Sequence, residues 1–229
     1  MSGLDVMKKV NANNQNFKTM SFEVLMTITR GKQTRERNFY NLKKYDGIVT
    51  KSLIKFYLPA NIKGTSLLTH SYEKKNEKNQ WIYLPALKSL SQIKGDKKKE
   101  SFMGSDYTYS DVAGRQLYED THTLVKKDKK YYYIKSVPKD KNDLYSQINL
   151  TVKRKHPVVS KAVFFTKKGK LKTLTNDPKS LRKIGPMYFF KRSIVVNNRT
   201  KGSTELELSA VKRNIPISDS DLGIKGLKD

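Results

Sequence analysis

Hydrophobic and polar residues alternate along most of this chain with a period of two, the pattern of half-buried β-strands. In residues 22–29 the apolar positions are Phe22, Val24, Met26 and Ile28, and most positions between them are polar. The same alternation in residues 203–213, with Leu206 on the apolar side, predicts one dry face for the last strand. The pattern predicts further strands over residues 34–45, 49–58, 65–73, 80–89, 116–126, 131–137, 145–155, 158–166 and 187–197.

Short polar segments separate these strands and predict hairpin turns, for example at residues 46–47, 74–79 and 127–130. About ten strands joined by short turns are typical of a mainly β or α+β domain with an antiparallel sheet. We therefore predict a single domain over residues 1–229, built as one curved sheet, a sandwich or a partly closed barrel.

Three segments depart from the strand pattern. Residues 2–10 begin with a Ser that can cap a helix and place Leu4, Met7 and Val10 on one helical face, which predicts a short helix. Residues 94–112 are longer than a hairpin turn needs, which indicates a functional loop or lid. Residues 176–186 form a second break, and a short helix is predicted over residues 179–183.

The absence of Cys excludes disulfides, thiolate zinc sites and cysteine nucleophiles. No apolar run approaches the ~20 residues that a helix needs to cross a bilayer. Residues 1–5 lack a basic start followed by an apolar run, so a secretory signal is either absent or has been removed. These observations leave both the cytosol and the periplasm open.

The formal net charge is +26, from 47 Lys and Arg against 21 Asp and Glu. Residues 144–204 hold 15 of these cations and a single acid, Asp177, so we expect a basic face in that part of the fold. Such an excess favours encounter with a polyanion, either nucleic acid or an anionic membrane surface.

Nucleic-acid binding is the first alternative function. The basic runs at residues 97–99, 126–127 and 153–155 could contact phosphates, and residues 131–133 are three tyrosines that could stack on bases. However, most aromatic residues alternate with aliphatic ones on faces that look buried, and no RNA-binding signature of the K/R-G-F/Y-G/A-F type occurs. We therefore consider nucleic acid the less favoured partner.

Candidate catalytic and metal-binding residues do not form a recognisable pattern. His70, His122 and His156 lie in separate strands or strand ends, without the close spacing of metal ligands. Acids cluster at residues 106 and 111 and at residues 119–120, but acid/base work needs opposed environments that spacing cannot show. Ser105 lacks the second glycine of a nucleophile elbow. We predict no enzyme activity, no catalytic residues, no metal and no cofactor.

Two nearby segments carry a family signature. Residues 81–88 read W-I-Y-L-P-A-L-K, and residues 101–111 read S-F-M-G-S-D-Y-T-Y-S-D. This pair resembles the bacterial outer-membrane lipoprotein-sorting protein family, relatives of the periplasmic lipoprotein carrier LolA. The resemblance extends over most of the chain, through residues 63–65, 133–139, 202–206 and 214–216. It departs from the family at Leu150, where an aromatic residue, often Trp, is expected.

The resemblance implies a strongly curved, incomplete antiparallel barrel whose concave side is covered by short helices and loops. It implies a hydrophobic cavity for acyl chains and a mobile lid formed by Phe102, Met103, Gly104, Ser105 and Asp106. For the cavity lining, the apolar strand positions offer these candidates: Phe22, Val24, Met26, Ile28, Ile54, Phe56, Trp81, Tyr83, Leu206 and Leu208.

The implied function is carriage of lipid or lipoprotein acyl chains without making or breaking a bond. The resemblance further implies a periplasmic protein with an inner-membrane transporter of the resistance-nodulation-division type as partner. The basic charge favours an anionic membrane surface as a partner, and we expect a monomer. A non-catalytic adaptor for a membrane transporter, with the cavity filled by its own side chains, is the second alternative.

Overall fold

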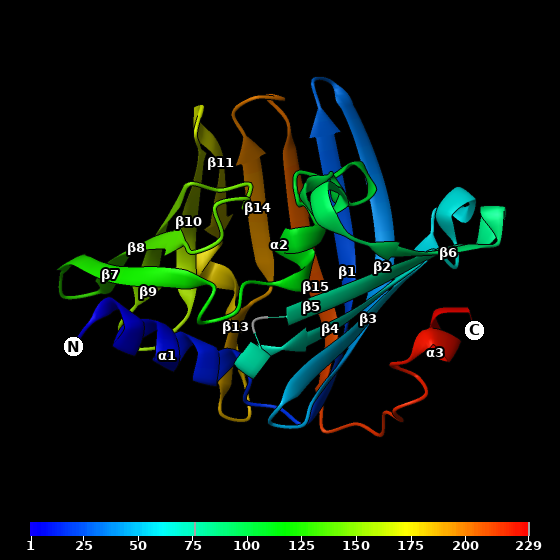
Figure 1. The fold of residues 1–229 in the computed structure, drawn as a ribbon, viewed down its shortest axis with the longest axis horizontal. Coiled ribbons are helices and arrows are strands. Elements are labelled where there is room, and N and C mark those ends of the chain that lie inside the picture. Colours follow the sequence, from blue (N-terminus) through cyan, green and yellow to red (C-terminus); the bar gives the residue numbers. More distant parts are fainter. Residues whose placement is uncertain (76, 229) are drawn as a thin grey trace.

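A single antiparallel sheet dominates the computed structural model, which describes residues 1–75 and 77–228. Its 13 strands are β1 (Thr19–Arg30), β2 (Gln33–Tyr45), β3 (Val49–Leu58), β4 (Ser66–Tyr72), β5 (Glu77–Leu84), β6 (Ser89–Ile93), β7 (Asp120–Lys127), β8 (Tyr131–Pro138), β9 (Gln147–Lys153), β10 (Val159–Thr166), β11 (Gly169–Asn176), β14 (Arg192–Asn197) and β15 (Ser203–Arg213). Their order is β6-β5-β4-β3-β2-β1-β15-β14-β11-β10-β9-β8-β7 (Figure 1).

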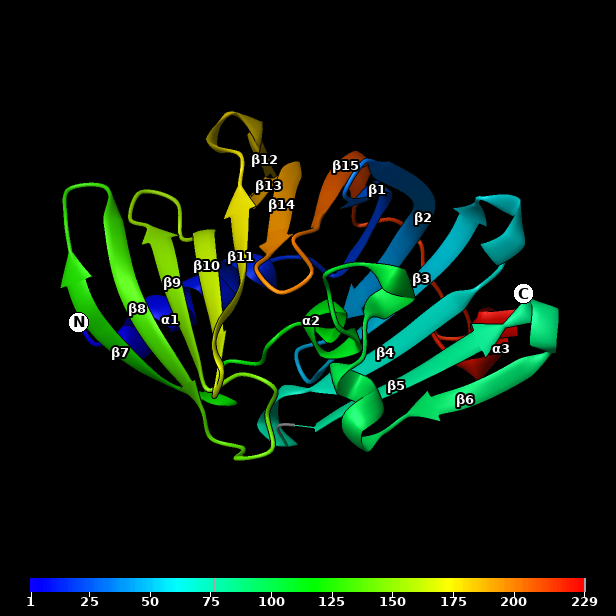
Figure 2. The ribbon, with the colours of Figure 1, turned by 90° about the horizontal axis from the view of Figure 1, so that it is seen from above.

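The first and last strands of the chain, β1 and β15, pair with each other in the middle of the sheet. One wing therefore consists of β1 to β6, and the other of β7 to β11 with β14 and β15. Figure 2 shows the wings diverging around a concave side. The prediction of a mainly β fold with one strongly curved antiparallel sheet is confirmed.

Residues 94–119, between β6 and β7, connect the two outer edges of the sheet, because β6 and β7 lie at opposite ends of the strand order. We call them the edge-to-edge segment. It includes the 3-10 turns Gly95–Lys99 and Phe102–Gly104 and the helix α2 (Tyr109–Ala113). Figure 2 shows α2 between the two wings, on the concave side. A hairpin turn would be too short for this path, and this explains the length of the loop.

Helix α1 (Gly3–Asn14) covers part of the second wing. Ser2 and Asp5 form a capping box at its start, in which each side chain accepts a hydrogen bond from the other residue's backbone N–H. The helix buries Val6 and Val10 against β8 and β9. Gly3 lies against β7 so closely that a Cβ atom would be 2.6 Å from the carbonyl oxygen of His122.

The concave face of the first wing is tightly packed. Val24, Met26 and Phe56 are almost completely buried there, and their alternation with more exposed residues follows the pleat of β1 and β3. Phe102, in the edge-to-edge segment, covers this core on the concave side. Its ring centroid lies 5.8 Å from that of Phe56 and 5.6 Å from that of Tyr109. The edge-to-edge segment therefore supplies the cover that this apolar face requires.

The C-terminal segment covers the opposite, outer face of the first wing. It ends in the short helix α3 (Ile224–Lys228), and Leu222 and Leu227 are fully buried against β3 and β4. Ser66 Oγ donates to the Leu227 carbonyl at 2.5 Å, and His70 Nε2 lies 2.8 Å from the Leu222 carbonyl. Both faces of β3 and β4 are therefore buried.

Several predicted element boundaries are wrong. The predicted strand 80–89 is a hairpin, because Pro85 begins the 3-10 turn Pro85–Leu87 between β5 and β6. The predicted strand 187–197 is divided between β14 and a separate hairpin of β12 (Leu181–Ile184) and β13 (Met187–Phe190). The helix predicted over residues 179–183 is divided between the 3-10 turn Pro178–Ser180 and β12, and β11 was not predicted.

The predicted turn at residues 74–79 is too long, because the structure has the 3-10 turn Glu73–Lys75 there and residues 77–79 already belong to β5. Asn76, in the middle of that prediction, lies outside the described residues. A further 3-10 turn, Ala60–Ile62, lies between β3 and β4. Among the described residues, no helix has the length and apolar character needed to cross a membrane.

Candidate functional site

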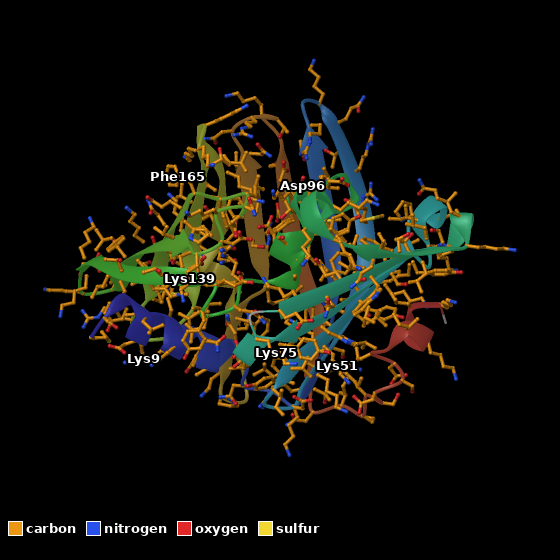
Figure 3. All side chains as sticks on the ribbon, viewed as in Figure 1. Lys9, Lys51, Lys75, Asp96, Lys139 and Phe165 are labelled. Carbon is orange, nitrogen blue, oxygen red and sulfur yellow. The ribbon has the colours of Figure 1, made fainter. Side chains whose placement is uncertain are left out.

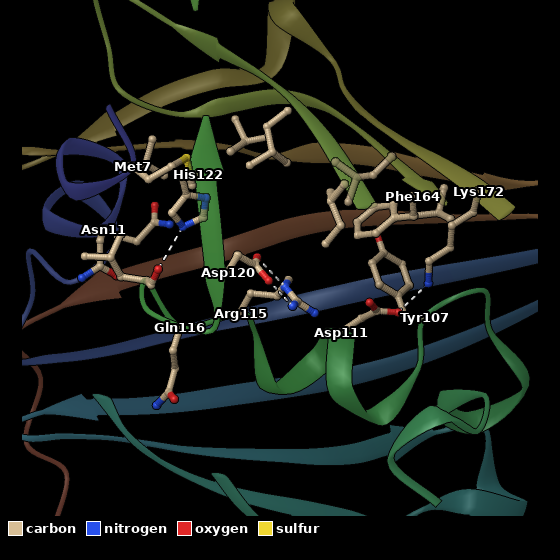
Figure 4. A pocket seen from close by; sticks show the side chains of 18 residues that line it. Met7, Asn11, Tyr107, Asp111, Arg115, Gln116, Asp120, His122, Phe164 and Lys172 are labelled. Carbon is tan, nitrogen blue, oxygen red and sulfur yellow. Dashed lines mark hydrogen bonds and ion pairs between the residues drawn. The ribbon is translucent and has the colours of Figure 1, made fainter. Parts of the chain in front are cut away.

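A cavity of about 240 Å³ lies between α1 and the concave face of the second wing (Figure 4). Its walls come from α1, the edge-to-edge segment and five strands, β7, β9, β10, β11 and β14. The lining residues are Met7, Val10, Asn11, Asn14, Tyr107, Asp111, Arg115, Gln116, Leu117, Asp120, His122, Ile148, Leu150, Val159, Phe164, Lys172, Leu174 and Val195.

One side of the cavity is an apolar wall. Ile148 and Leu150 are two residues apart on β9, so the pleat directs both toward the concave side, and Met7 and Val10 face them from α1. The volume exceeds the ~150 Å³ of an apolar cavity that binds benzene, but it is below the ~300–1,000 Å³ typical of pockets for drug-sized ligands. The cavity can therefore hold a short apolar group or one end of a longer chain.

A buried ion pair closes one end of the cavity. Lys172, on β11, is 2% exposed, and its Nζ donates to Asp111 Oδ2 in α2 and, at 2.7 Å, to the backbone carbonyl of Asp106. Tyr145 donates its hydroxyl hydrogen to the other Asp111 oxygen at 2.7 Å. Figure 4 shows the Lys172 and Asp111 side chains meeting beside Tyr107. This network ties the edge-to-edge segment to the sheet.

Aromatic rings surround the same ammonium group. Lys172 Nζ lies 5.4 Å from the ring centre of Phe164, 5.6 Å from that of Tyr145 and 5.9 Å from that of Tyr107. Burial, and next the negative charge of Asp111, raise the pKa of Tyr145 well above its ordinary value. Burial also raises the pKa of Tyr107. Both tyrosines are therefore neutral at physiological pH.

A second ion-pair network lies where the edge-to-edge segment enters β7. Arg115 donates through Nε to Asp120 Oδ2 at 2.9 Å, through Nη2 to the other Asp120 oxygen, and through Nη1 to Asp143 Oδ2 at 3.0 Å. Burial disfavours the charged guanidinium, but the hydrogen bond and charge of Asp120 together with Asp143 raise the pKa of Arg115 overall. One guanidinium therefore bridges both acids.

The polar groups of the cavity wall are engaged in structural contacts. His122 has Ser136 Oγ 2.7 Å from Nδ1 and the Leu117 carbonyl 2.9 Å from Nε2, so both ring nitrogens have partners. Tyr107 and Gln116 are the exceptions, since the Tyr107 hydroxyl and both polar atoms of the Gln116 amide have no hydrogen-bond partner within the described residues, and Gln116 is 6% exposed. This amide is able to pair with a polar group of a ligand.

The acidic clusters that the sequence raised as acid/base candidates are divided among separate cations. Asp106 accepts from Arg30 Nη1 at 2.9 Å, and Glu119 lies 2.6 Å from Lys78 Nζ. No three His, Asp or Glu side chains of residues 1–75 and 77–228 come together in a way that could hold a metal ion. The arrangement is suited to holding an apolar group rather than to moving a proton.

A larger polar cleft of about 870 Å³ shares Arg115 with the apolar cavity. Two of its four lysines pair with acids, Lys78 with Glu119 at 2.6 Å and Lys99 with Asp96 at 2.7 Å. Cationic side chains also occur on both wings, as Figure 3 shows for Lys51 on β3 and Lys139 after β8. The apolar cavity is therefore the more distinctive candidate site.

Comparisons with known proteins agree with this architecture. A family model described only as an uncharacterized protein matches residues 48–228, most of the chain. The putative outer membrane lipoprotein-sorting protein domain from Vibrio parahaemolyticus is similar, with 25% identity, a TM-score of 0.92, and coverage of 99% of this chain and 98% of that one. A DUF1329 family protein from Desulfovibrio piger has 25% identity and a TM-score of 0.91, covering 98% and 97%.

The fold is shared more widely. A LolA superfamily protein from Nitrosomonas europaea has 15% identity and a TM-score of 0.76, with coverage of 97% of this chain and 98% of that one. The chain belongs to the family whose model matches residues 48–228, and it has a LolA-like fold. No curated protein matches it. The family resemblance carried by residues 81–88 and 101–111 is therefore confirmed.

In this LolA-like chain, none of the ten residues proposed from the sequence as cavity lining contacts the 240 Å³ cavity. Eight of them lie in or against the packed core of the first wing: Phe22, Val24, Met26, Ile28, Ile54, Phe56, Leu206 and Leu208. Trp81 and Tyr83 lie on the outer face beneath the C-terminal segment, because alternation on β5 places Ile82 on the concave side. Contact of these ten residues with a ligand stays a prediction.

The lid residues of the LolA-like chain are in a closed position. Phe102 is 2% exposed, and Met103 packs against the same core. Ser105 Oγ donates to the Phe102 carbonyl at 2.7 Å, and Asp106 accepts hydrogen bonds from Arg30 and, at 2.8 Å, from Thr204 Oγ1. Gly104 has a φ of +77°, a conformation that glycine adopts readily. Movement of this loop stays a prediction.

Most residues of the cavity were missed by the sequence analysis. Met7 and Val10 were assigned to a covering helix, and Leu150 was singled out because it departs from the family pattern, but strands β10, β11 and β14 supplied no signal of a cavity. Lys172 lies among other lysines in the sequence, and nothing local distinguishes it from an exposed one. Its burial depends on contacts with residues 61 and 66 positions away.

Proposed function

We propose that residues 1–229 form a single domain that carries lipid or lipoprotein acyl chains in the periplasm and takes no part in bond making or breaking. The observation that carries this proposal is the apolar cavity between α1 and β9 to β11 within a LolA-like fold. Burial of an acyl chain contributes about 0.8 kcal/mol per methylene, so such a site needs apolar walls rather than reactive groups. The relative from Vibrio parahaemolyticus is described as a putative lipoprotein-sorting domain.

The size of the cavity defines how a chain would enter. A volume of about 240 Å³ accepts one end of an acyl chain, and a longer chain requires α1 or the edge-to-edge segment to move outward. Residues 102–106 are the lid in this proposal, and the eight apolar strand residues in or against the core beneath it become accessible when that lid opens. Trp81 and Tyr83 lie on the outer face and stay covered by the C-terminal segment. The partners proposed are an inner-membrane transporter or an anionic membrane surface, with the carrier acting as a monomer.

The experiment is a binding measurement with a fluorescent fatty-acid probe, together with native mass spectrometry of gently purified protein. We expect co-purified lipid and saturable probe binding. Leu150→Trp fills the cavity and should weaken probe binding by at least about tenfold, since at least two methylenes lose their place. Val125→Trp is the matched control, because Val125 is 63% exposed on β7.

Two results would contradict carriage. The first is the absence of lipid and of probe binding in the unmodified protein. The second is equal probe affinity for Leu150→Trp and Val125→Trp, which would place any bound probe outside this cavity. Binding of oligonucleotides with a steep salt dependence and no response to Leu150→Trp would instead favour the nucleic-acid alternative.

A further inference from the structure

Two hairpin turns at one end of the first wing carry the most exposed leucines of the described residues. Leu87 is 71% exposed, Leu58 is 52% exposed and Leu90 is 36% exposed. The β3–β4 and β5–β6 connections lie at the same end of their strands because the meander reverses direction at each turn. A Cβ on Gly64 would be 3.1 Å from Pro85 Cγ, so the two turns touch. We call residues 58–64 and 84–90 the docking tip.

The local geometry holds these leucines outward. Pro85 begins the 3-10 turn Pro85–Leu87, and Lys88 ends it with a φ of 47°. Leu87 is part of the W-I-Y-L-P-A-L-K signature, in which Trp81 and Tyr83 pack under the C-terminal segment and Leu84 against the concave core. Leu87 has no place in either core, although its sequence neighbours do. The cavity does not account for this residue, since it lies on the other wing.

The charges around the docking tip have one sign. Within the tip, Lys63 and Lys88 are exposed and no acid occurs, and Lys55 on β3 is half-buried. Within residues 49–95 the acids are Glu73 and Glu77, which lie at the β4–β5 connection, the opposite end of these strands. Figure 1 shows the tip at the edge of the molecule opposite the N-terminus of α1. Exposed leucines flanked by lysines are the composition of a surface that inserts shallowly into an anionic lipid interface.

We propose that the docking tip inserts Leu58 and Leu87 into an anionic lipid surface while Lys63 and Lys88 contact the head groups. Protein is the less suitable occupant, because two short turns offer a narrow contact, whereas a stable protein interface buries roughly 800 Å² per partner. The inference goes beyond the proposed cavity function, since it concerns a different wing of the sheet. Docking and acyl binding can therefore fail independently.

The test is flotation of the full chain with vesicles of phosphatidylcholine alone and of phosphatidylcholine with phosphatidylglycerol. We expect preferential binding to the anionic vesicles, weakened by salt. Leu87→Ser and Leu58→Ser should each reduce binding by about tenfold, because each removes an apolar side chain that the lipid would bury. Lys63→Glu should reduce binding to anionic vesicles alone. Val125→Ser and Lys129→Glu, exposed substitutions on the far wing, serve as matched controls and should bind as the unmodified protein does.

Several outcomes would overturn the proposal: no vesicle binding by the unmodified chain, equal binding to both vesicle types, or equal losses in the tip variants and their controls. Circular dichroism and the unfolding midpoint establish that each variant is folded, and Leu87→Met should retain binding. The fatty-acid probe gives a second readout that separates the two proposals. Tip variants should keep full probe affinity, whereas Leu150→Trp should lose probe affinity and keep vesicle binding.

Discussion

Lys172 on β11 and Asp111 in α2 form a buried ion pair, although 61 positions separate them in the sequence. The side chains are 3% and 10% exposed, and the lysine has the further support of the Asp106 carbonyl and three aromatic rings. The pair joins the edge-to-edge segment to the second wing at the end of the cavity. The ion pair therefore holds the edge-to-edge segment against β11.

Lys172→Met should lower the free energy of unfolding by about 3–5 kcal/mol, because it leaves Asp111 as a buried charge without its cation. Chemical denaturation measures this change. Lys170→Met, an exposed neighbour on the same strand, is the control and should change stability by less than about 0.5 kcal/mol. Adding Asp111→Asn to Lys172→Met should recover part of the loss. A loss no larger than that of the control would show that the pair is not buried in solution.

The two buried tyrosines predict a loss of stability in alkali. Because burial raises the pKa of Tyr145 and Tyr107 in the folded state, the unfolded chain releases these protons first as the pH rises. The unfolded state then binds fewer protons than the folded state, so the free energy of unfolding should fall from about pH 10 upward. Urea denaturation across this range measures the slope. Tyr145→Phe should be less stable at neutral pH and show a shallower alkaline decline, and an unchanged slope would contradict the assignment.

Gly3→Ala tests the contact between α1 and β7. Helix propensity alone predicts that Ala stabilises a helix relative to Gly by about 1 kcal/mol. The added Cβ would instead be 2.6 Å from the His122 carbonyl oxygen, a backbone atom, so we expect a net destabilisation of about 1–3 kcal/mol. Thermal unfolding decides the sign. Lys9→Ala, at an exposed position of the same helix, should be close to neutral, and stabilisation by Gly3→Ala would show that α1 does not rest on β7.

Phe102→Ala tests whether the lid residue is part of the core in the free protein. Phe102 is 2% exposed and packs between Phe56 and Tyr109, so its removal should cost about 3–5 kcal/mol. Val125→Ala, at a 63% exposed position, should change stability little. Equilibrium denaturation compares the two variants. A cost below about 1 kcal/mol would indicate that the loop is mainly open without ligand.

The sequence predicted those features that depend on neighbouring residues. Alternation located most strands, as for β3. It did not show which face of β5 is concave, since Trp81 and Tyr83, proposed as cavity lining, lie on the outer face and Ile82 lies on the concave one. The length of residues 94–112 correctly indicated more than a hairpin turn. The prediction of one strand over residues 80–89 was wrong, because Pro85 introduces a turn within a segment whose apolar pattern is typical of a single strand.

Tertiary structure alone decided where the cavity lies. Alternation shows which residues share a face, but both wings of a curved sheet have an apolar concave face, and only the path of the covering segments determines which wing is filled. Phe102 fills the first wing, whereas α1 leaves a space beside Leu150 on the second. The partners of Asp111 and Asp106 likewise come from distant strands. The sequence thus determined the sheet and its faces, and long-range packing determined the site, because a cavity is the space that non-neighbouring side chains leave unfilled.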